Sequence, residues 1–262
     1  MRSLFGDLSG SLRNPEFWAL STWLDIVVKY RQSRLGILWL LAPPAIYVWG
    51  LGGFFAGMQG TGLAGFAAHV GVGYAIFRAI NNVIIESTSV FGSSSAFIMD
   101  GHLRLTDYIL RVVAKALFYF AMALPIIAIA LLIFPHLNWG GLAFSLLSFP
   151  LIVLNALWIA VVFSLIGARF PDLSQFIGNV FIFAFLLTPI IWYADSMPPG
   201  SLRGVFMRMN PLFHMVEIVR APILGELIEP LTFYYLGVMT VVGWGIAAFL
   251  YRRYARFVPL WV

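Results

Sequence analysis

The chain has 262 residues, of which 61% are hydrophobic and only 10% charged, with a formal net charge of +5. Ordinary soluble domains are about 45–50% apolar and about 25% charged, so this composition excludes an ordinary soluble protein and predicts an all-α membrane protein. The positive charge does not indicate nucleic-acid binding, because the lysines and arginines sit at the ends of apolar segments instead of clustering on one solvated surface. With no cysteine in the chain, disulfides and thiolate metal sites are excluded.

Residues 14–33 precede the first long apolar segment and predict an amphipathic interfacial helix. Asn14 is a suitable N-cap and Pro15 a suitable first helical residue. Apolar side chains such as Trp23 then share one arc, whereas Asp25 and Lys29 share the opposite arc four residues apart. Such a helix is too polar to span and should lie along the cytoplasmic headgroups, either as a simple membrane anchor or as part of a cytoplasmic entrance.

Six apolar segments are long enough to cross about 30 Å of hydrocarbon as helices, which takes roughly 20 residues each. These predicted spans are 35–55, 63–85, 112–134, 142–168, 176–194 and 232–251. Lysines and arginines concentrate before span one and after spans two, four and six, while the loops after spans one and three have none. The positive-inside rule therefore predicts that both termini are cytoplasmic.

Span two carries a polar stripe, because Tyr74, Arg78, Asn82 and Glu86 recur every four residues. Intramembrane charge is costly and usually faces protein or water. Three interpretations stay open: a structural contact between helices or subunits, the lining of a polar path, or snorkelling of Arg78 toward the cytoplasmic end of the span.

Residues 86–110 form a cytoplasmic connection that is longer than helix packing requires. It contains Asp100, His102, Arg104 and Asp107. The connection is expected either to dock a partner or to be an idle solvated loop.

Aromatic residues make up 16% of the chain. Most are expected to be core or membrane-interface residues, but aromatic faces also stack on sugar rings, so an aromatic-lined conduit would let a polysaccharide slide. The candidates for such a lining are Tyr47, Trp49, Phe181, Phe185, Trp192 and Tyr193.

Residues 195–231, between spans five and six, predict two short amphipathic helices, the second beginning at Asn210 and Pro211. At about ten residues each they can enter the outer leaflet but not cross it. We therefore expect a re-entrant hairpin on the non-cytoplasmic side, with its turn buried in protein or facing a wet cavity.

Catalytic and metal sites are not predicted. The four histidines lie in separate segments without metal-ligand spacing, and no pair of carboxylates suggests acid–base chemistry. No phosphate-binding loop of the Walker type is present, so ATP hydrolysis would have to come from a partner.

Three segments together resemble a known family. The first is Tyr30 to Trp39 followed by Pro43 and Pro44, the second is Gly167 to Asp172, and the third is Asn210 to His214 followed by Glu217 to Pro222. They are similar to the permease subunit of type-two ATP-binding-cassette exporters of bacterial surface polysaccharides, closest to the O-antigen (Wzm-type) branch. Capsule and teichoic acid permeases are near relatives, and a drug or small-lipid exporter of the same fold is a further alternative.

The resemblance implies a homodimer in the bacterial inner membrane that pairs with two ATPase subunits, which would hold the ATP and Mg²⁺, and exports a glycan linked to a lipid of the undecaprenyl pyrophosphate type. It places Tyr30, Arg31 and Arg34 at the substrate entrance and makes the segment from Asp100 to Asp107 the ATPase coupling helix. The same resemblance implies that the hairpin is a periplasmic gate, whose residues would be Asn210, Pro211, His214, Glu217 and Arg220.

Overall fold

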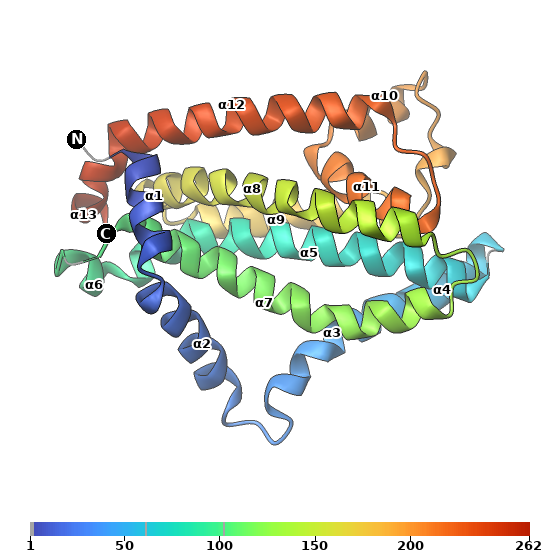
Figure 1. Ribbon diagram of the computed structural model, residues 1–262, viewed down its shortest axis with the longest axis horizontal. Helices are drawn as coiled ribbons and strands as arrows, with labels where there is room; N and C mark the ends of the chain where they lie inside the picture. The colour runs from blue at the N-terminus through green and yellow to red at the C-terminus, as the bar shows by residue number, and fades with distance from the viewer. Residues whose placement is uncertain (1–2, 61, 102) are drawn as a thin grey trace.

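The computed structural model describes residues 3–60, 62–101 and 103–262. These residues are almost entirely helical, and five helical segments are long and apolar enough to cross a membrane. They are the broken first segment Gly36–Met58, α5 (Leu63–Ser93), α7 (Leu105–Leu132), α8 (Trp139–Arg169) and the C-terminal segment Pro230–Trp261, which begins with α12 (Pro230–Tyr254). The long helices run lengthwise side by side, and both ends of the chain lie at the same end of the bundle, here named the terminal end (Figure 1). The opposite end is the distal end.

Helix α5 forms the centre of the bundle. In its most apolar stretch 72% of the residues are buried, against 17% in the first segment and 17% in the C-terminal segment. Small residues let its neighbours approach closely: a Cβ atom added at Gly167 on α8 would collide with the carbonyl group of Thr88 on α5. The predicted second span, 63–85, therefore coincides with the best-buried helix, although Arg78 on its polar stripe is exposed.

The first segment is not a regular helix. It starts as a 3-10 turn over Gly36–Leu41, continues through α3 (Ala42–Ala45) and a π-helical turn over Ile46–Leu51, and ends as α4 (Gly52–Gln59). Pro43 and Pro44 lack backbone N–H groups and clash with the preceding turn, so the regular hydrogen-bond pattern cannot run through them. The irregularity follows directly from the adjacent prolines.

The N-terminal region differs from the expectation in two respects. An unforeseen helix, α1 (Leu4–Arg13), is capped by Ser3, whose Oγ accepts a hydrogen bond from the N–H of Gly6 at 3.1 Å. Asn14 ends α1, with its side-chain amide donating to the carbonyl of Gly10, and α2 (Glu16–Tyr30) begins without a side-chain cap. The prediction of Asn14 as an N-cap was wrong, because the preceding residues form a helix and Asn14 is its C-cap.

Helix α2 runs obliquely away from the bundle and forms a V with the start of the first segment (Figure 1). Its polar arc, expected to face water, packs on α7: Thr22 is buried and its hydroxyl lies 3.3 Å from the carbonyl oxygen of Arg111, and Asp25 pairs with the guanidinium of Arg111 at 2.7 Å. Most of the apolar arc, including Trp23, is exposed.

The connection between α5 and α7 is shorter than predicted. Helix α5 continues to Ser93, the short helix α6 (Ser95–Met99) follows, and α7 begins at Leu105. Much of the segment 86–110 is thus helix that extends the two spans. The backbone N–H of Arg104 donates to the Asp107 carboxylate at 2.9 Å, which fixes the start of α7.

The predicted fifth span, 176–194, is helical only in part. Helix α9 (Leu173–Leu187) is apolar but has 15 residues, or about 22 Å. Pro189, which lacks an N–H, follows Thr188 in extended conformation and ends the helix. Beyond it, α10 (Leu202–Met209) and α11 (Pro211–Leu224) meet at Asn210, and α13 (Val258–Trp261) closes the chain after α12.

Candidate functional site

Two adjoining hollows beside α5 bring several predicted residues together. The first, the polar hollow, has a volume of about 300 Å³ and lies between α2, α3, α5 and α7; the second, the aromatic hollow, has a volume of about 360 Å³ and lies between the first segment, α5 and α9. Tyr74, Arg78 and Ile85 line both. All four members of the predicted polar stripe line the polar hollow: Tyr74, Arg78, Asn82 and Glu86.

The polar hollow is positively charged. Glu86 lies 2.7 Å from Lys115, so its carboxylate is already paired, whereas among the described residues no carboxylate lies within 4.0 Å of Lys29 or Arg78. Lys29 comes from the end of α2, and its ammonium lies 5.8 Å from the centre of the Tyr119 ring. Two cations that line one hollow without a carboxylate partner can attract an anionic group.

Tyrosine hydroxyls add hydrogen-bonding capacity to the polar hollow. Tyr30 lines it at the end of α2, and burial raises the pKa of its hydroxyl, with nearby Lys115 opposing that shift. The group therefore stays protonated and can donate. The buried hydroxyl of Tyr119 has no hydrogen-bond partner among the described residues, so it too is available to a polar ligand.

The aromatic hollow contains a continuous set of ring contacts. The Tyr47 ring stacks on Tyr74 at 4.3 Å between centroids and meets the Phe185 ring edge-on at 5.7 Å. Phe77 meets Phe185 at 5.4 Å and Phe181 at 5.7 Å. Tyr47, Phe181 and Phe185 were predicted as lining residues and Phe77 was not, although its place on the α5 face that carries Tyr74 could have indicated it.

The other predicted aromatic and entrance residues lie elsewhere. Trp49 packs against a small cluster around Val48, and Trp192 and Tyr193 lie near His69 in the extended segment after α9. Arg31 and Arg34 are exposed in the turn after α2 and do not line either hollow. The structure therefore separates these residues from the paired hollows.

A buried charged cluster, the distal cluster, joins α11 to α5 and to the segment after α9. Arg220 is 1% exposed and donates to the Glu217 carboxylate at 2.7 Å and to the carbonyl of Pro189. The Nε2 atom of His69 lies 3.1 Å from Arg220 and 3.1 Å from the carbonyl oxygen of Trp192. This nitrogen can serve only one of them as a hydrogen-bond partner at a time.

A second set of contacts fixes the start of α11. The Asn210 side chain accepts from the N–H of Leu212 at 3.0 Å and donates to Thr188 at 2.9 Å. His214 is fully buried, with Nε2 2.7 Å from the carbonyl of Arg208 and Nδ1 2.9 Å from the Thr232 hydroxyl. A carbonyl can only accept, so Nε2 carries the proton and Nδ1 accepts from the hydroxyl. Burial lowers the pKa of His214.

Arg208 ties α10 to the start of α12. Its guanidinium makes a bidentate contact with Glu229, with the Nε atom 2.8 Å from one carboxylate oxygen, and it also donates to the carbonyl of Met197 at 3.1 Å. This pair was not predicted from the sequence. Pro211 is exposed and fills the first position of α11, where its missing N–H does no harm.

The predicted coupling residues divide into exposed and structural positions. Asp100 is exposed beside α6, whereas Asp107 is 4% exposed and caps α7. The Arg104 side chain lies directly over Gly10 of α1, and His102 lies outside the described residues. No three potential metal ligands among histidines and carboxylates lie together within residues 3–60, 62–101 and 103–262.

Comparison with known proteins connects this arrangement to a family. The model of the ABC-2 type transporter family matches residues 16–224. Two proteins of Klebsiella pneumoniae, both named O-antigen export system permease protein RfbA, are similar at 24% identity over 245 residues and 23% over 243, each match covering 88% of this chain and 91% of the relative. A Myxococcus xanthus protein of the same name is 24% identical over 208 residues, which is 75% of this chain and 76% of the relative.

Proposed function

The chain belongs to the ABC-2 type transporter family, and we propose that it is the permease subunit of an exporter that moves lipid-linked O-antigen polysaccharide across the bacterial inner membrane. Membership confirms the resemblance noted at 30–39, 167–172 and 210–222, all of which fall within the matched region. The proposed substrate rests on the names of the relatives and on the paired hollows. ATP hydrolysis would take place in a separate subunit.

The proposed topology has six crossings with both termini in the cytoplasm. Lys and Arg residues favour a cytoplasmic terminal end, where Arg13, Arg169, Arg253 and Arg256 lie. Helix α9 with the extended residues after it would make the fifth crossing, and α10 with α11 would form a re-entrant hairpin in the outer leaflet. The buried hydrogen bonds of the hairpin support this position, because the N–H and C=O groups of non-helical backbone at membrane depth need hydrogen-bond partners from protein or water.

The single observation that carries the function is the junction of the two hollows at Arg78. In the proposed homodimer, the aromatic hollows would face the path between the two copies. There the aromatic rings would stack on sugar rings without holding the glycan at one tight site. In the polar hollow, Lys29 and Arg78 would hold the lipid pyrophosphate. Arg31 and Arg34 would act earlier, as exposed cations at the entrance.

The test is export in a strain that lacks the chromosomal gene and is complemented with variants. Lys29→Gln with Arg78→Gln should reduce surface glycan at least tenfold, because both cations facing the hollow are lost, while the chain still assembles with its ATPase. Arg169→Gln removes an exposed cation outside both hollows and should export normally. Unchanged surface glycan in the deletion strain would refute the function; unchanged glycan in the double variant would refute only the roles of Lys29 and Arg78.

A further inference from the structure

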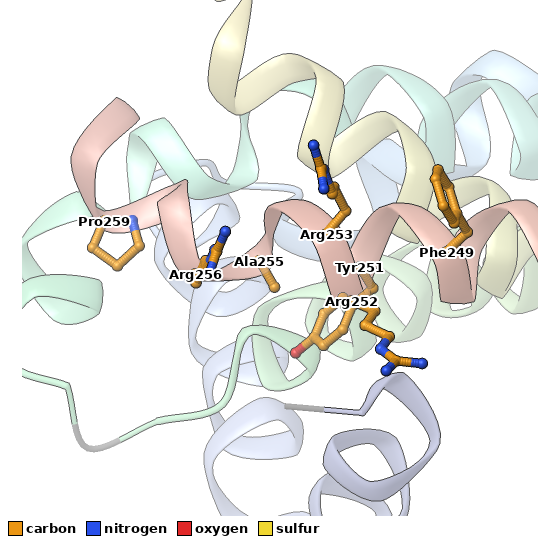
Figure 2. Close-up of a pocket in the computed structure, with 7 residues that line it drawn as sticks. All are labelled: Phe249, Tyr251, Arg252, Arg253, Ala255, Arg256 and Pro259. Carbon is orange, nitrogen blue, oxygen red and sulfur yellow. The ribbon is translucent and has the colours of Figure 1, made fainter. Parts of the chain in front are cut away.

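The end of α12 forms a hollow that the proposed transport path does not use. After Tyr254 the chain turns through a 3-10 segment, Ala255–Phe257, into α13. The hollow, here named the arginine notch, has a volume of about 610 Å³ and is lined chiefly by Phe249, Tyr251, Arg252, Arg253, Arg256 and Pro259. Figure 2 shows these side chains on the last turns of α12, on the turn that follows and, for Pro259, on α13.

The arginine notch carries exposed positive charge. Arg253 and Arg256 are exposed, and neither has a carboxylate within 4.0 Å in the part of the chain that the structure describes. The Arg256 guanidinium lies 4.6 Å from the centre of the Phe257 ring, a cation–π contact that holds it in place. Asp7, the acidic residue of α1, accepts a hydrogen bond from the Tyr251 hydroxyl at 2.7 Å.

An apolar strip leads along α12 to the notch. Tyr234, Val238, Val241 and Phe249 are 74%, 63%, 75% and 67% exposed, and their spacing, continued through Gly245, places them on one helical face. The strip extends over 15 residues, or about 22 Å, and ends beside Arg252 and Arg253. An exposed apolar face that ends in cations matches a lipid, whose chain is apolar and whose headgroup is anionic.

Simpler effects explain only part of this arrangement. Arginines in the last turn of a helix complement its dipole, and cytoplasmic cations orient a membrane protein. These effects account for Arg252 and Arg253 at the end of α12. The positive-inside rule also accounts for the charge of Arg256, but neither effect requires a hollow that is lined by arginine side chains at the end of an exposed apolar strip.

We propose that the arginine notch binds the phosphate of an anionic phospholipid whose acyl chain lies along the exposed strip of α12. The lipid would hold the last span and α13 at headgroup level. Since α1 is hydrogen-bonded to Tyr251 within the same region, the bound lipid would also stabilise the packing of α1 against α12.

The test compares full-length protein in nanodiscs of phosphatidylcholine with nanodiscs that contain 30% phosphatidylglycerol. Thermal unfolding should occur at a higher temperature with phosphatidylglycerol, and R253Q/R256Q should lose at least half of that difference. R13Q/R169Q, which removes the same charge from exposed positions outside the notch, should retain it. R253K/R256K keeps the charge and separates a loss of binding from a failure to fold.

Native mass spectrometry supplies a second readout. The wild-type chain should retain one more phosphatidylglycerol per copy than R253Q/R256Q. Equal loss in R13Q/R169Q, or an equal thermal shift from soluble glycerol 3-phosphate, would overturn the proposal in favour of diffuse charge or a free anion. Loss of the co-expressed ATPase from R253Q/R256Q with unchanged lipid retention would also overturn it and assign the notch to protein docking.

Discussion

Replacement of Arg220 by methionine should cause the largest loss of stability of any single change at the distal end. The guanidinium is 1% exposed and its partner carboxylate, on Glu217, is 9% exposed, so the single variant leaves a buried charge unpaired. Breaking a buried pair in this way costs about 3–5 kcal/mol. The carbonyl of Pro189 also loses its donor.

A double variant shows whether the loss of stability comes from losing the ion pair or from leaving one buried charge unpaired. Replacing both residues, Glu217→Leu with Arg220→Met, removes the charge and keeps much of the volume, so the net change should be within about 1–2 kcal/mol of zero. A matched control is Arg208→Met, whose partner carboxylate on Glu229 is 33% exposed and can be rehydrated. Its cost should be smaller, about 1–2 kcal/mol.

The stability losses of these variants can be ranked by thermal unfolding in detergent, followed by the fluorescence of the nine tryptophans. For a chain of this size 3–5 kcal/mol corresponds to a fall on the order of 10 °C in Tm for Arg220→Met. The double variant should recover most of it. A loss in Arg220→Met no greater than in Arg208→Met, or a double variant less stable than the single one, would refute the reasoning.

Three further predictions concern packing, titration and the attachment of α2. Gly167→Ala should destabilise the protein by about 1–3 kcal/mol, because its Cβ meets backbone of α5, whereas Gly178→Ala, which meets nothing within 4 Å, should be neutral or stabilising; Tm separates the two. Burial lowers the pKa of His214 in the folded chain. Below about pH 6.5 the unfolded chain therefore binds a proton at this residue more readily than the folded chain does, and the folded state loses stability. Tm should fall between pH 7 and pH 5, and it should fall less in His214→Gln. The pair of Asp25 and Arg111, with side chains 31% and 24% exposed, contributes about 0–1 kcal/mol, so Asp25→Asn should leave Tm nearly unchanged but reduce surface glycan; normal export would mean that this contact does not position α2.

Periodicity and composition predicted the helices that are long and strongly apolar, but not the interruptions within them. Pro43, Pro44 and Pro189 were visible in the sequence, yet their effect on the first and fifth spans depends on which neighbouring groups can satisfy the released carbonyls. Helix α1 escaped prediction because Gly6 and Gly10 weaken its intrinsic helix propensity. Tertiary contacts, including the 2.6 Å hydrogen bond between Ser11 and Thr106, hold it in place.

The candidate site was predicted where residues share one helix and missed where helices meet. The stripe from Tyr74 to Glu86 follows from a four-residue repeat, and the structure places it beside the paired hollows. The roles of Lys29 and Tyr119 depend on how α2 crosses α7, and the partnership of Arg220 with Pro189 depends on where α9 ends. Such long-range contacts leave no periodic signal in a single sequence.

The distribution of these contacts indicates which parts of the molecule can move during transport. At the distal end, buried hydrogen bonds join α11 to α5, to α12 and to the segment after α9, so this region is expected to move as one body. The first segment is 17% buried over its apolar window and contains 3-10 and π turns, whose hydrogen bonds have poorer geometry. Since α2 and the first segment form two walls of the polar hollow, their displacement would open the hollow at little cost in buried contacts. Swinging α11 alone would instead separate the buried Arg220 guanidinium from the carbonyl of Pro189 and from His69.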